Sequence, residues 1–195
     1  MQLYYTPRSH FSRKVRILMA ALDLSVELLD VGNVADANEL AFGPNPLMKV
    51  PTLVDGMVVV FDSDHICQYL VQKYDPLDQF GVLVREVDVC NTRAILNSIM
   101  AAEVDLILAA RTGIATEHHP RFDKVKLVIR HGLEWLENNA ALFSVGPLSL
   151  SFHLVCMWDH LLLFGNMPTD LALSNLAARI HQLEDLPYIS STKPQ

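Results

Sequence analysis

Ser9 stands just before His10 to Leu22, a stretch whose apolar residues recur at the spacing of an α-helix. A serine at that position is either an ordinary N-cap or a hydroxyl placed where the helix N–H groups and dipole favour an anion. A thiolate bound there would also receive the Ser9 O–H. Lowering a thiol pKa of about 8.5 by one unit requires about 1.4 kcal/mol, which one or two charge-assisted hydrogen bonds supply.

A second group of candidate binding residues lies between positions 49 and 64. Val50-Pro51 is either the start of an edge strand or, with a cis bond, a ledge whose backbone pairs with an extended ligand. Asp62-Ser63-Asp64 is either a helix cap or a clamp, with Ser63 and the helix N–H groups on a carboxylate and an aspartate on an ammonium. Lys49 is either an exposed loop residue or the ligand of a second carboxylate.

The histidines and cysteines indicate no metal or redox centre. His153 and His160 are seven residues apart, so they share one helix face, and we expect buried, hydrogen-bonded side chains there. No cysteine lies near residue 9, which argues against Cys-x-x-Cys chemistry and a disulfide reductase. The odd number and wide spacing of the cysteines favour a reducing, cytoplasmic location. These cysteines are Cys67, Cys90 and Cys156.

The first 75 residues have the alternating elements of an α/β domain. Strands at Leu3–Tyr5 and Val26–Val31, separated by the helix at 10–22, predict a βαβ unit with parallel strands. A polar loop at 32–46 carries an expected short helix around 35–41. Two further strands, 52–54 and 57–61, are joined by a predicted type I′ turn at Asp55-Gly56. Ser63 is the expected N-cap of a helix that runs to about residue 74.

After the linker at 75–78 the strand patterns disappear and only helical periodicity remains. The predicted helices span 84–111, 122–139, 150–164 and 171–183. The sequence therefore predicts an α/β domain over residues 1–75 and an all-α domain over residues 84–195.

Composition excludes several classes of protein. The 195 residues are 51% hydrophobic and 19% charged, which favours a large core over disorder. The net charge of −7 argues against partners that are nucleic acids or anionic membranes. The longest apolar run, 148–164, is interrupted by two histidines and an aspartate and is typical of a buried helix rather than a membrane span. No signal peptide is visible at the N-terminus.

Three ordered segments resemble the glutathione S-transferase superfamily. Tyr5 to Arg16 (YTPRSHFSRKVR) is similar to the family's first strand, active-site turn and first helix. Asn45 to Pro51 (NPLMKVP) resembles its Asn-Pro-x-Gly-Lys-Val-Pro segment, with Met48 in place of glycine. Asp62 to Leu70 (DSDHICQYL) resembles its Glu-Ser-x-x-Ile-x-x-Tyr-Leu segment, with aspartate in place of glutamate. Because of Met48, we expect either a different loop before Lys49 or an ordinary φ at this methionine.

The resemblance implies a thioredoxin-like N-terminal domain (β-α-β-α-β-β-α), an all-α C-terminal domain and a homodimer. It implies glutathione as co-substrate, with no other cofactor and no metal, and a small electrophile as second substrate. Ser9 would activate the thiol. Val50 and Pro51 would hold the cysteinyl part, Asp62 and Ser63 the γ-glutamyl part, and Lys49 the glycyl carboxylate. The expected second-substrate pocket comprises His10, Phe11, Met100, Glu103, Val104, Ile107 and Arg111.

Two functions stay open at this point. The first is a transferase that adds the glutathione thiolate to a hydrophobic electrophile. The second is a non-catalytic stress or regulatory protein that uses the same fold as an interaction module, which the departures at Met48 and Asp62 motivate.

Overall fold

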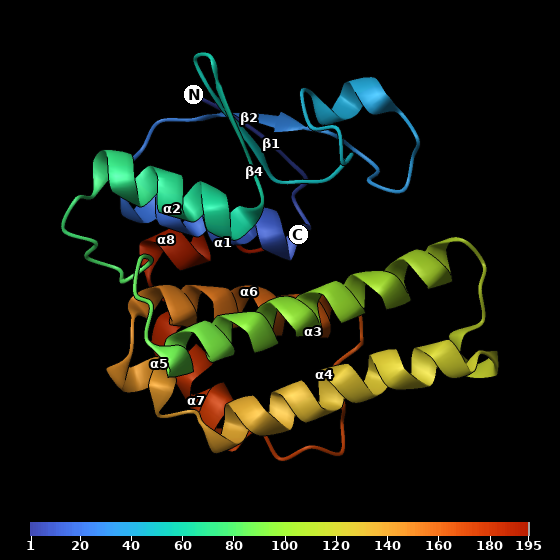
Figure 1. Ribbon diagram of the computed structural model, residues 1–195. Helices are drawn as coiled ribbons and strands as arrows, with labels where there is room; N and C mark the ends of the chain where they lie inside the picture. Colours follow the sequence, from blue (N-terminus) through green and yellow to red (C-terminus); the bar gives the residue numbers. More distant parts are fainter. Residues whose placement is uncertain (195) are drawn as a thin grey trace. The chain divides into compact units, whose positions relative to one another are not determined.

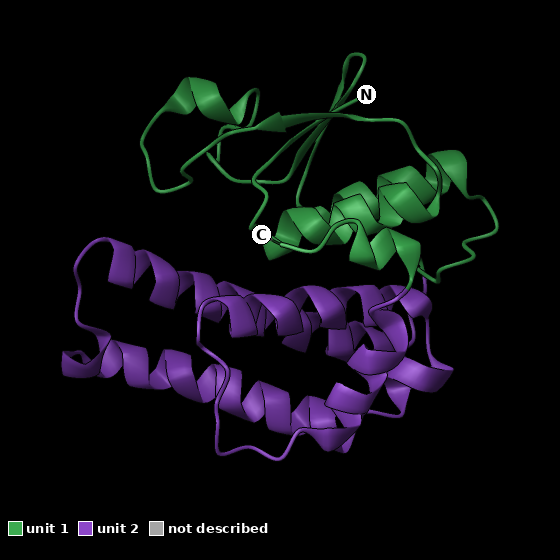
Figure 2. Cartoon of the chain, turned by 180° about the vertical axis from the view of Figure 1, so that it is seen from behind, with its two compact units in different colours: residues 1–83, 186–195 green, residues 84–185 purple. Residues whose placement is uncertain are grey.

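The computed structural model describes residues 1–194, which form two compact units (Figures 1 and 2). Unit 1 contains residues 1–83 and the C-terminal segment from Leu186, and unit 2 contains Val84–Asp185. No helix within residues 1–194 combines the length and the apolar character that crossing a membrane requires.

Unit 1 is built on a mixed sheet. Its strands are β1 (Gln2–Tyr5), β2 (Glu27–Asp30), β3 (Thr52–Asp55) and β4 (Val58–Phe61), in the order β2-β1-β3-β4. β1 and β2 are parallel, as the βαβ pattern predicts, and the other pairs are antiparallel. The helices of this unit are α1 (His10–Ala21), α2 (Ser63–Tyr74) and the short α8 (Pro187–Ser190).

The register of the sheet explains where the core of unit 1 lies. Leu3, Leu53 and Val60 are direct partners across three strands and are at most 3% exposed. Because partners in a ladder point to the same face, these side chains form one apolar surface. Helix residues with full burial complete this core: Val15, Leu18, Ile66 and Leu70.

The loop after β2 forms a single 3₁₀ turn, η1 (Glu39–Phe42), instead of the short helix expected around 35–41. Asn33 holds residues 33–36 in another conformation, because its side chain accepts from the Ala35 N–H and donates to Asp36. Gly43 then passes directly over Tyr4. A Cβ at Gly43 would lie 2.5 Å from the Tyr4 ring, and its φ is 59°, so both space and backbone favour glycine.

The hairpin turn lies one residue later than predicted. Asp55 pairs with Val58 at the end of the ladder, so the two turn residues are Gly56-Met57 rather than Asp55-Gly56. Gly56 has a φ of 63°, whereas Met57 has no positive φ, so the type I′ prediction was wrong. Asp55 is held in the strand because its carboxylate accepts hydrogen bonds from Tyr69 and Lys73 of α2.

Unit 2 consists of helices with short connections. The principal helices are α3 (Val87–Arg111), α4 (Pro120–Asn138), α6 (Leu148–Leu163) and α7 (Ser174–Leu183). Shorter turns are η2 (Thr116–His118) and α5 (Leu142–Val145). The four long helices were all predicted, with ends that differ by up to three residues. The apolar α6 lies at the centre of this unit, and ten of its residues are buried.

The C-terminal segment does not follow the domain division predicted at residue 84. The sequence pattern assigns 84–195 to the helical domain, whereas the segment from Leu186 onward packs with unit 1. The reason is a contact with α1. The buried Arg13 guanidinium lies 3.4 Å from the Ile189 carbonyl oxygen and 3.5 Å from the Thr192 hydroxyl, and donates to both.

Candidate functional site

Ser9 is the N-cap of α1. Its hydroxyl oxygen accepts the N–H of Ser12 at 3.1 Å, and its backbone carbonyl accepts the N–H of Arg13 at 2.8 Å. The ordinary capping role is therefore present. It is compatible with the second role, because a hydroxyl that accepts one bond retains its proton for donation. Ser9 is half-buried, so this proton is placed at an accessible helix start.

Asn45 fixes the loop that leads to Val50. Its side-chain amide donates to the Lys49 carbonyl and to the Thr52 hydroxyl, both at 2.8 Å, and its carbonyl oxygen accepts the N–H of Leu47 at 2.9 Å. Asn45 is 5% exposed, so these bonds form away from water and hold the loop firmly. Our sequence reasoning gave Asn45 no role, although an asparagine followed by proline is a signal for such a turn.

The segment between Met48 and Pro51 has two unusual backbone features. The Val50-Pro51 peptide bond is cis, the form that the ledge interpretation requires. Met48 has a φ of 50°, a left-handed conformation that favours glycine. The expectation of an ordinary φ at Met48 is therefore wrong, and a loop that differs from the family's stays a prediction. Val50 is half-buried, Pro51 is buried and Lys49 is exposed.

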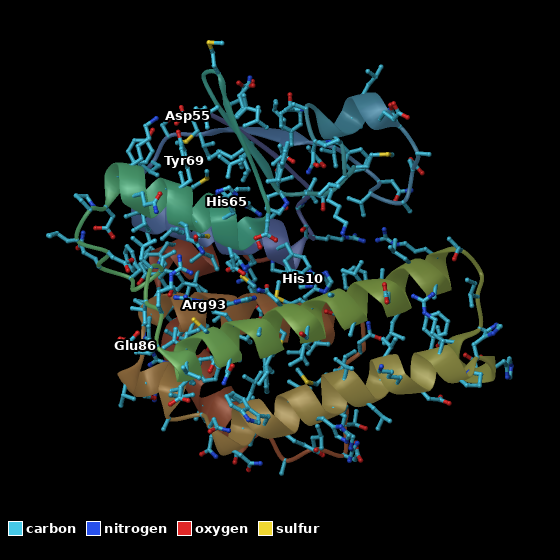
Figure 3. All side chains as sticks on the ribbon, viewed as in Figure 1. His10, Asp55, His65, Tyr69, Glu86 and Arg93 are labelled. Carbon is cyan, nitrogen blue, oxygen red and sulfur yellow. The ribbon has the colours of Figure 1, made fainter. Side chains whose placement is uncertain are left out.

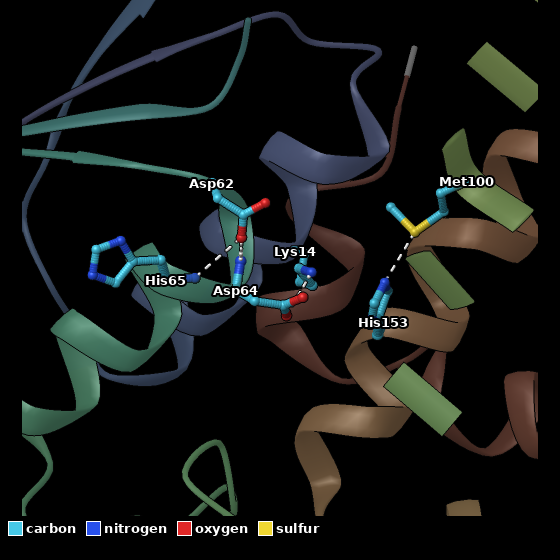
Figure 4. Close-up of polar contacts among 6 residues, drawn as sticks. All are labelled: Lys14, Asp62, Asp64, His65, Met100 and His153. Atoms are coloured by element: carbon cyan, nitrogen blue, oxygen red, sulfur yellow. Dashed lines mark hydrogen bonds and ion pairs between the residues drawn. The ribbon is translucent and has the colours of Figure 1, made fainter. Parts of the chain in front are cut away.

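Asp62, not Ser63, is the N-cap of α2. Its Oδ1 accepts the N–H of Asp64 at 2.8 Å and of His65 at 3.3 Å (Figure 4). Ser63 is the first residue of the helix and is 2% exposed, so the prediction of a Ser63 cap was wrong. Asp62 reaches the helix N–H groups because its backbone has a φ of 70°. Within residues 1–194, its other oxygen, Oδ2, accepts no protein hydrogen bond.

Asp64 has a different partner. Its carboxylate lies 2.8 Å from the Lys14 ammonium of α1, and only 6% of the Lys14 side chain is exposed (Figure 4). This ion pair links α1 to α2, the two helices that Ser9 and Asp62 cap. Of the two acidic residues considered for an ammonium group, Asp62 is therefore the one with an oxygen still available.

The residues expected to form the second-substrate pocket belong to two units. His10 and Phe11 are in unit 1, where their rings lie 4.6 Å apart, and the remaining five are on α3 in unit 2. Val104 and Ile107 are half-buried and Arg111 is exposed. A pocket that includes both sets stays a prediction.

Met100 and Glu103 contact the central helix of unit 2. Met100 Sδ lies 3.1 Å from His153 Nε2 (Figure 4), and Glu103 Oε2 lies 2.6 Å from His160 Nδ1. Both α3 residues are fully buried, which makes them core residues of this unit. The two histidines are at most 5% exposed, which confirms the expectation of buried, hydrogen-bonded side chains.

A polar cluster outside this group joins β3 to α2. Asp55 Oδ2 accepts from the Tyr69 hydroxyl at 2.8 Å and from the Lys73 ammonium, and Figure 3 shows Asp55 and Tyr69 on neighbouring elements. The hydrogen bond from Lys73, followed by the one from Tyr69, holds the pKa of Asp55 below its usual value of 3.8. The cluster ties the hairpin to the helix that begins at Asp62.

Comparison with known proteins gives a family match for the N-terminal part of the chain. Residues 3–77 match the family model of the glutathione S-transferase N-terminal domain. A stringent starvation protein A homolog from Coxiella burnetii is 39% identical over 77 residues. That match covers 38% of this chain and 35% of the relative's length.

Solved structures match over nearly the whole chain. A glutathione S-transferase from Methylobacillus flagellatus, with glutathione bound, has a TM-score of 0.82 at 20% identity and covers 100% of this chain and 99% of its own. One from Methylobacterium radiotolerans, in complex with glutathione sulfonate, has a TM-score of 0.80 at 23% identity, with coverages of 99% and 94%. At these identities the likeness establishes the fold.

Proposed function

We propose that this chain, a member of the glutathione S-transferase superfamily by its N-terminal domain and its fold, binds glutathione and activates the thiol for transfer to a small hydrophobic electrophile. The proposal includes a homodimer in the cytoplasm and a role in detoxification.

The observation that carries the proposal is the geometry of Ser9. Its oxygen is occupied by the N–H of Ser12, so the hydroxyl proton is the group left to interact with a ligand. A thiolate at this point receives the Ser9 O–H and the favourable end of the α1 dipole. Catalysis would come from the lowered thiol pKa and from the alignment of the two substrates.

The remaining contacts are assigned to donors and acceptors that form no hydrogen bond within the described protein. Glutathione carries an ammonium and a carboxylate on its γ-glutamyl part. Asp62 Oδ2 accepts from the ammonium, while the hydroxyl and the N–H of Ser63, at the positive end of α2, donate to the carboxylate. The Val50 backbone next to cis-Pro51 pairs with the cysteinyl part, and the exposed Lys49 binds the glycyl carboxylate.

Replacing Ser9 tests the proposal. Ser9→Gly removes the hydroxyl at a cap position where glycine costs only a few tenths of a kcal/mol, and Ser9→Thr keeps it. We expect Ser9→Gly to raise the apparent pKa of bound glutathione by about one unit, equivalent to about 1.4 kcal/mol, and to lower kcat. The measurement is the thiolate absorbance and the pH–rate profile with a chromogenic electrophile.

Ser12→Ala is the matched control. The Ser12 hydroxyl is buried and has no hydrogen-bond partner within residues 1–194, so removing it leaves the Ser9 cap in place. We expect this variant to retain the thiol pKa of the unmodified protein. An identical pH–rate profile for Ser9→Gly and Ser12→Ala would remove Ser9 from the mechanism.

A second candidate is a non-catalytic regulatory module. The observation that favours it is the 39% identity to a stringent starvation protein A homolog over 77 residues. Calorimetry separates the two candidates. Heat of binding with millimolar glutathione supports the transferase, whereas its absence in the folded protein supports the module.

A further inference from the structure

Unit 2 has an open hollow that is lined by α5, by α7 and by the residue Ala140 that follows α4. Figure 1 labels these three helices. The space within the lining of this hollow, part of which is open solvent, is about 450 Å³. Most of the lining is polar or small, and Arg179 is its only residue with a full charge. The lining residues are Ala140, Ser144, Asn175, Ala178, Arg179 and Gln182.

Arg179 makes its hydrogen bonds to neutral oxygens. Its Nε and one terminal nitrogen donate to the Ser151 hydroxyl at 3.3 and 3.2 Å, and the other terminal nitrogen donates to Gln182 Oε1 at 3.1 Å. Ser151 is fully buried and itself donates to the Phe143 carbonyl, so it holds the guanidinium in place. A guanidinium has five N–H donors, and these three bonds leave two of them.

Within residues 1–194, Arg179 forms no ion pair with a carboxylate. The guanidinium is half-buried, and this burial lowers the pKa of Arg179 without an opposing charge to raise it. Withdrawing a cation from water is unfavourable unless an anion or several hydrogen bonds compensate. The charge of Arg179 is therefore only partly compensated.

Glu137, the acidic residue that is hydrogen-bonded to the lining residue Asn175, does not neutralise Arg179. The Glu137 carboxylate accepts the N–H groups of Asn175 and Leu176 and the Asn175 side-chain amide, at 2.8 to 3.0 Å. It thereby caps α7, and its charge is opposed by the positive end of that helix. Arg179, one turn further along α7, keeps its own unpaired charge.

We propose that this hollow binds a small oxyanion, the carboxylate or phosphate group of a small molecule, through the Arg179 guanidinium. Arginine presents paired N–H groups that match both kinds of oxyanion. The Ser144 hydroxyl and the Gln182 amide nitrogen supply neutral donors on the same lining. The site is independent of the proposed glutathione site, because all of its residues belong to unit 2.

The lining favours a small molecule over a protein partner. Its apolar part consists of Ala140 and Ala178, which offer single methyl groups. Stable protein interfaces are anchored by large side chains that become buried in the partner. This hollow offers no apolar pocket that would bury such a side chain. A compact anion with few non-hydrogen atoms uses the charge and donors that the hollow does provide.

Isothermal calorimetry on the full chain tests the proposal, with inorganic phosphate and succinate as probes at fixed ionic strength in chloride. We expect saturable binding of at least one probe. Arg179→Gln should weaken it at least tenfold. Gln182→Glu should weaken it similarly while leaving Arg179 in place, because a carboxylate at the Gln182 Oε1 position, 3.1 Å away, occupies the guanidinium.

Arg130→Gln is the matched control, because the Arg130 guanidinium is already paired with Asp170 at 2.8 Å. We expect its anion affinity to equal that of the unmodified protein, and circular dichroism verifies that each variant is folded. Binding of phosphate alone or succinate alone supports the site and identifies the source of the oxyanion. No saturable binding of either probe, or equal weakening in Arg130→Gln, would overturn the proposal.

Discussion

At the scale of single residues, Met48 occupies a conformation that suits glycine. Its φ of 50° costs a residue with a Cβ about 1–2 kcal/mol, whereas glycine loses about 0.5–1 kcal/mol through its larger unfolded-state entropy. We therefore predict that Met48→Gly raises the free energy of unfolding by about 0.5–1 kcal/mol. Urea denaturation followed by circular dichroism measures the change.

Leu47→Gly provides the comparison for Met48→Gly. Leu47 is 63% exposed and has no positive φ, so glycine there adds only unfolded-state entropy. We expect it to lower the free energy of unfolding by about 0.5–1 kcal/mol. Loss of stability of equal size in both variants would show that the left-handed backbone at Met48 carries no cost.

The site residues differ in how far the sequence predicts them. Ser9 was identifiable because helical periodicity begins at the next residue, and periodicity is a local property. The sequence does not decide whether Asp62 or Ser63 is the cap, because both residue types cap helices. The outcome depends on the φ of 70° at Asp62. That angle depends on the path of the chain as it leaves β4. The residue types around position 62 do not determine this path.

At the scale of secondary structure elements, α7 begins without a cap of its own. Leu173 at the N-cap position offers no side-chain acceptor, and Glu137 of α4 accepts the N–H groups of Asn175 and Leu176 instead. We predict that Glu137→Gln lowers the free energy of unfolding by about 1–2 kcal/mol, because a neutral amide keeps one acceptor and loses the charge. Thermal and urea unfolding measure this loss.

Glu134→Gln is the control for the cap. Glu134 lies one turn before Glu137 on α4 and pairs with Arg130 at 3.4 Å on the surface. Exposed pairs of this kind contribute little, so we expect a change below about 0.5 kcal/mol. If both substitutions have the same effect, Glu137 does not act through α7.

The link between β3 and α2 predicts a dependence on pH. The hydrogen bonds from Lys73 and Tyr69 lower the pKa of Asp55 in the folded state below that in the unfolded chain. The folded protein therefore binds this proton more weakly, and the stabilisation is present above about pH 4 and lost as the pH falls through the folded pKa. Because Lys73 is 44% exposed, the effect stays below about 1 kcal/mol.

Asp55→Asn measures this contribution. We expect the variant to be less stable than the unmodified protein at pH 7, with a difference that shrinks below about pH 4. Urea midpoints at a series of pH values provide the data. A difference that stays constant or grows on acidification would exclude Asp55 as the titrating group.

Elements with strong local patterns were predicted well, and their ends less well. The pattern predicted a helix from about residue 84, whereas α3 begins at Val87. Residues before it are held differently, since Asp78 accepts the N–H groups of Val82 and Leu83. The hairpin turn shifted because Asp55 is tied to α2, a contact fourteen residues away in the chain. Local periodicity contains no information on such contacts.

At the scale of the whole molecule, the chain returns at its end to the unit in which it began. Arg13 of α1 is 2% exposed and donates to Ile189, 176 residues away, and to Thr192, 179 residues away. The local sequence gives no sign that this basic residue of α1 is buried, because its partners are so distant. The buried position of Arg13 therefore emerges only in the folded chain.

Removing residues 186–195 should therefore destabilise unit 1. Ile189 is 2% exposed, and loss of its buried side chain alone costs about 1.5–3 kcal/mol. The buried Arg13 guanidinium also loses two acceptors, which adds about 1–3 kcal/mol. We predict a corresponding fall in the free energy of unfolding and, by hydrogen exchange, reduced protection of the α1 amides.

Two point variants separate these contributions from the effect of shortening the chain. Ile189→Ala should lower the free energy of unfolding by about 2–4 kcal/mol, whereas Lys193→Ala, at an exposed position, should change it by less than about 0.5 kcal/mol. The α1 amides should lose protection in Ile189→Ala and not in Lys193→Ala. Full protection of α1 in the shortened chain would mean that this helix, and with it the Ser9 cap, is held by the sheet and α2 alone.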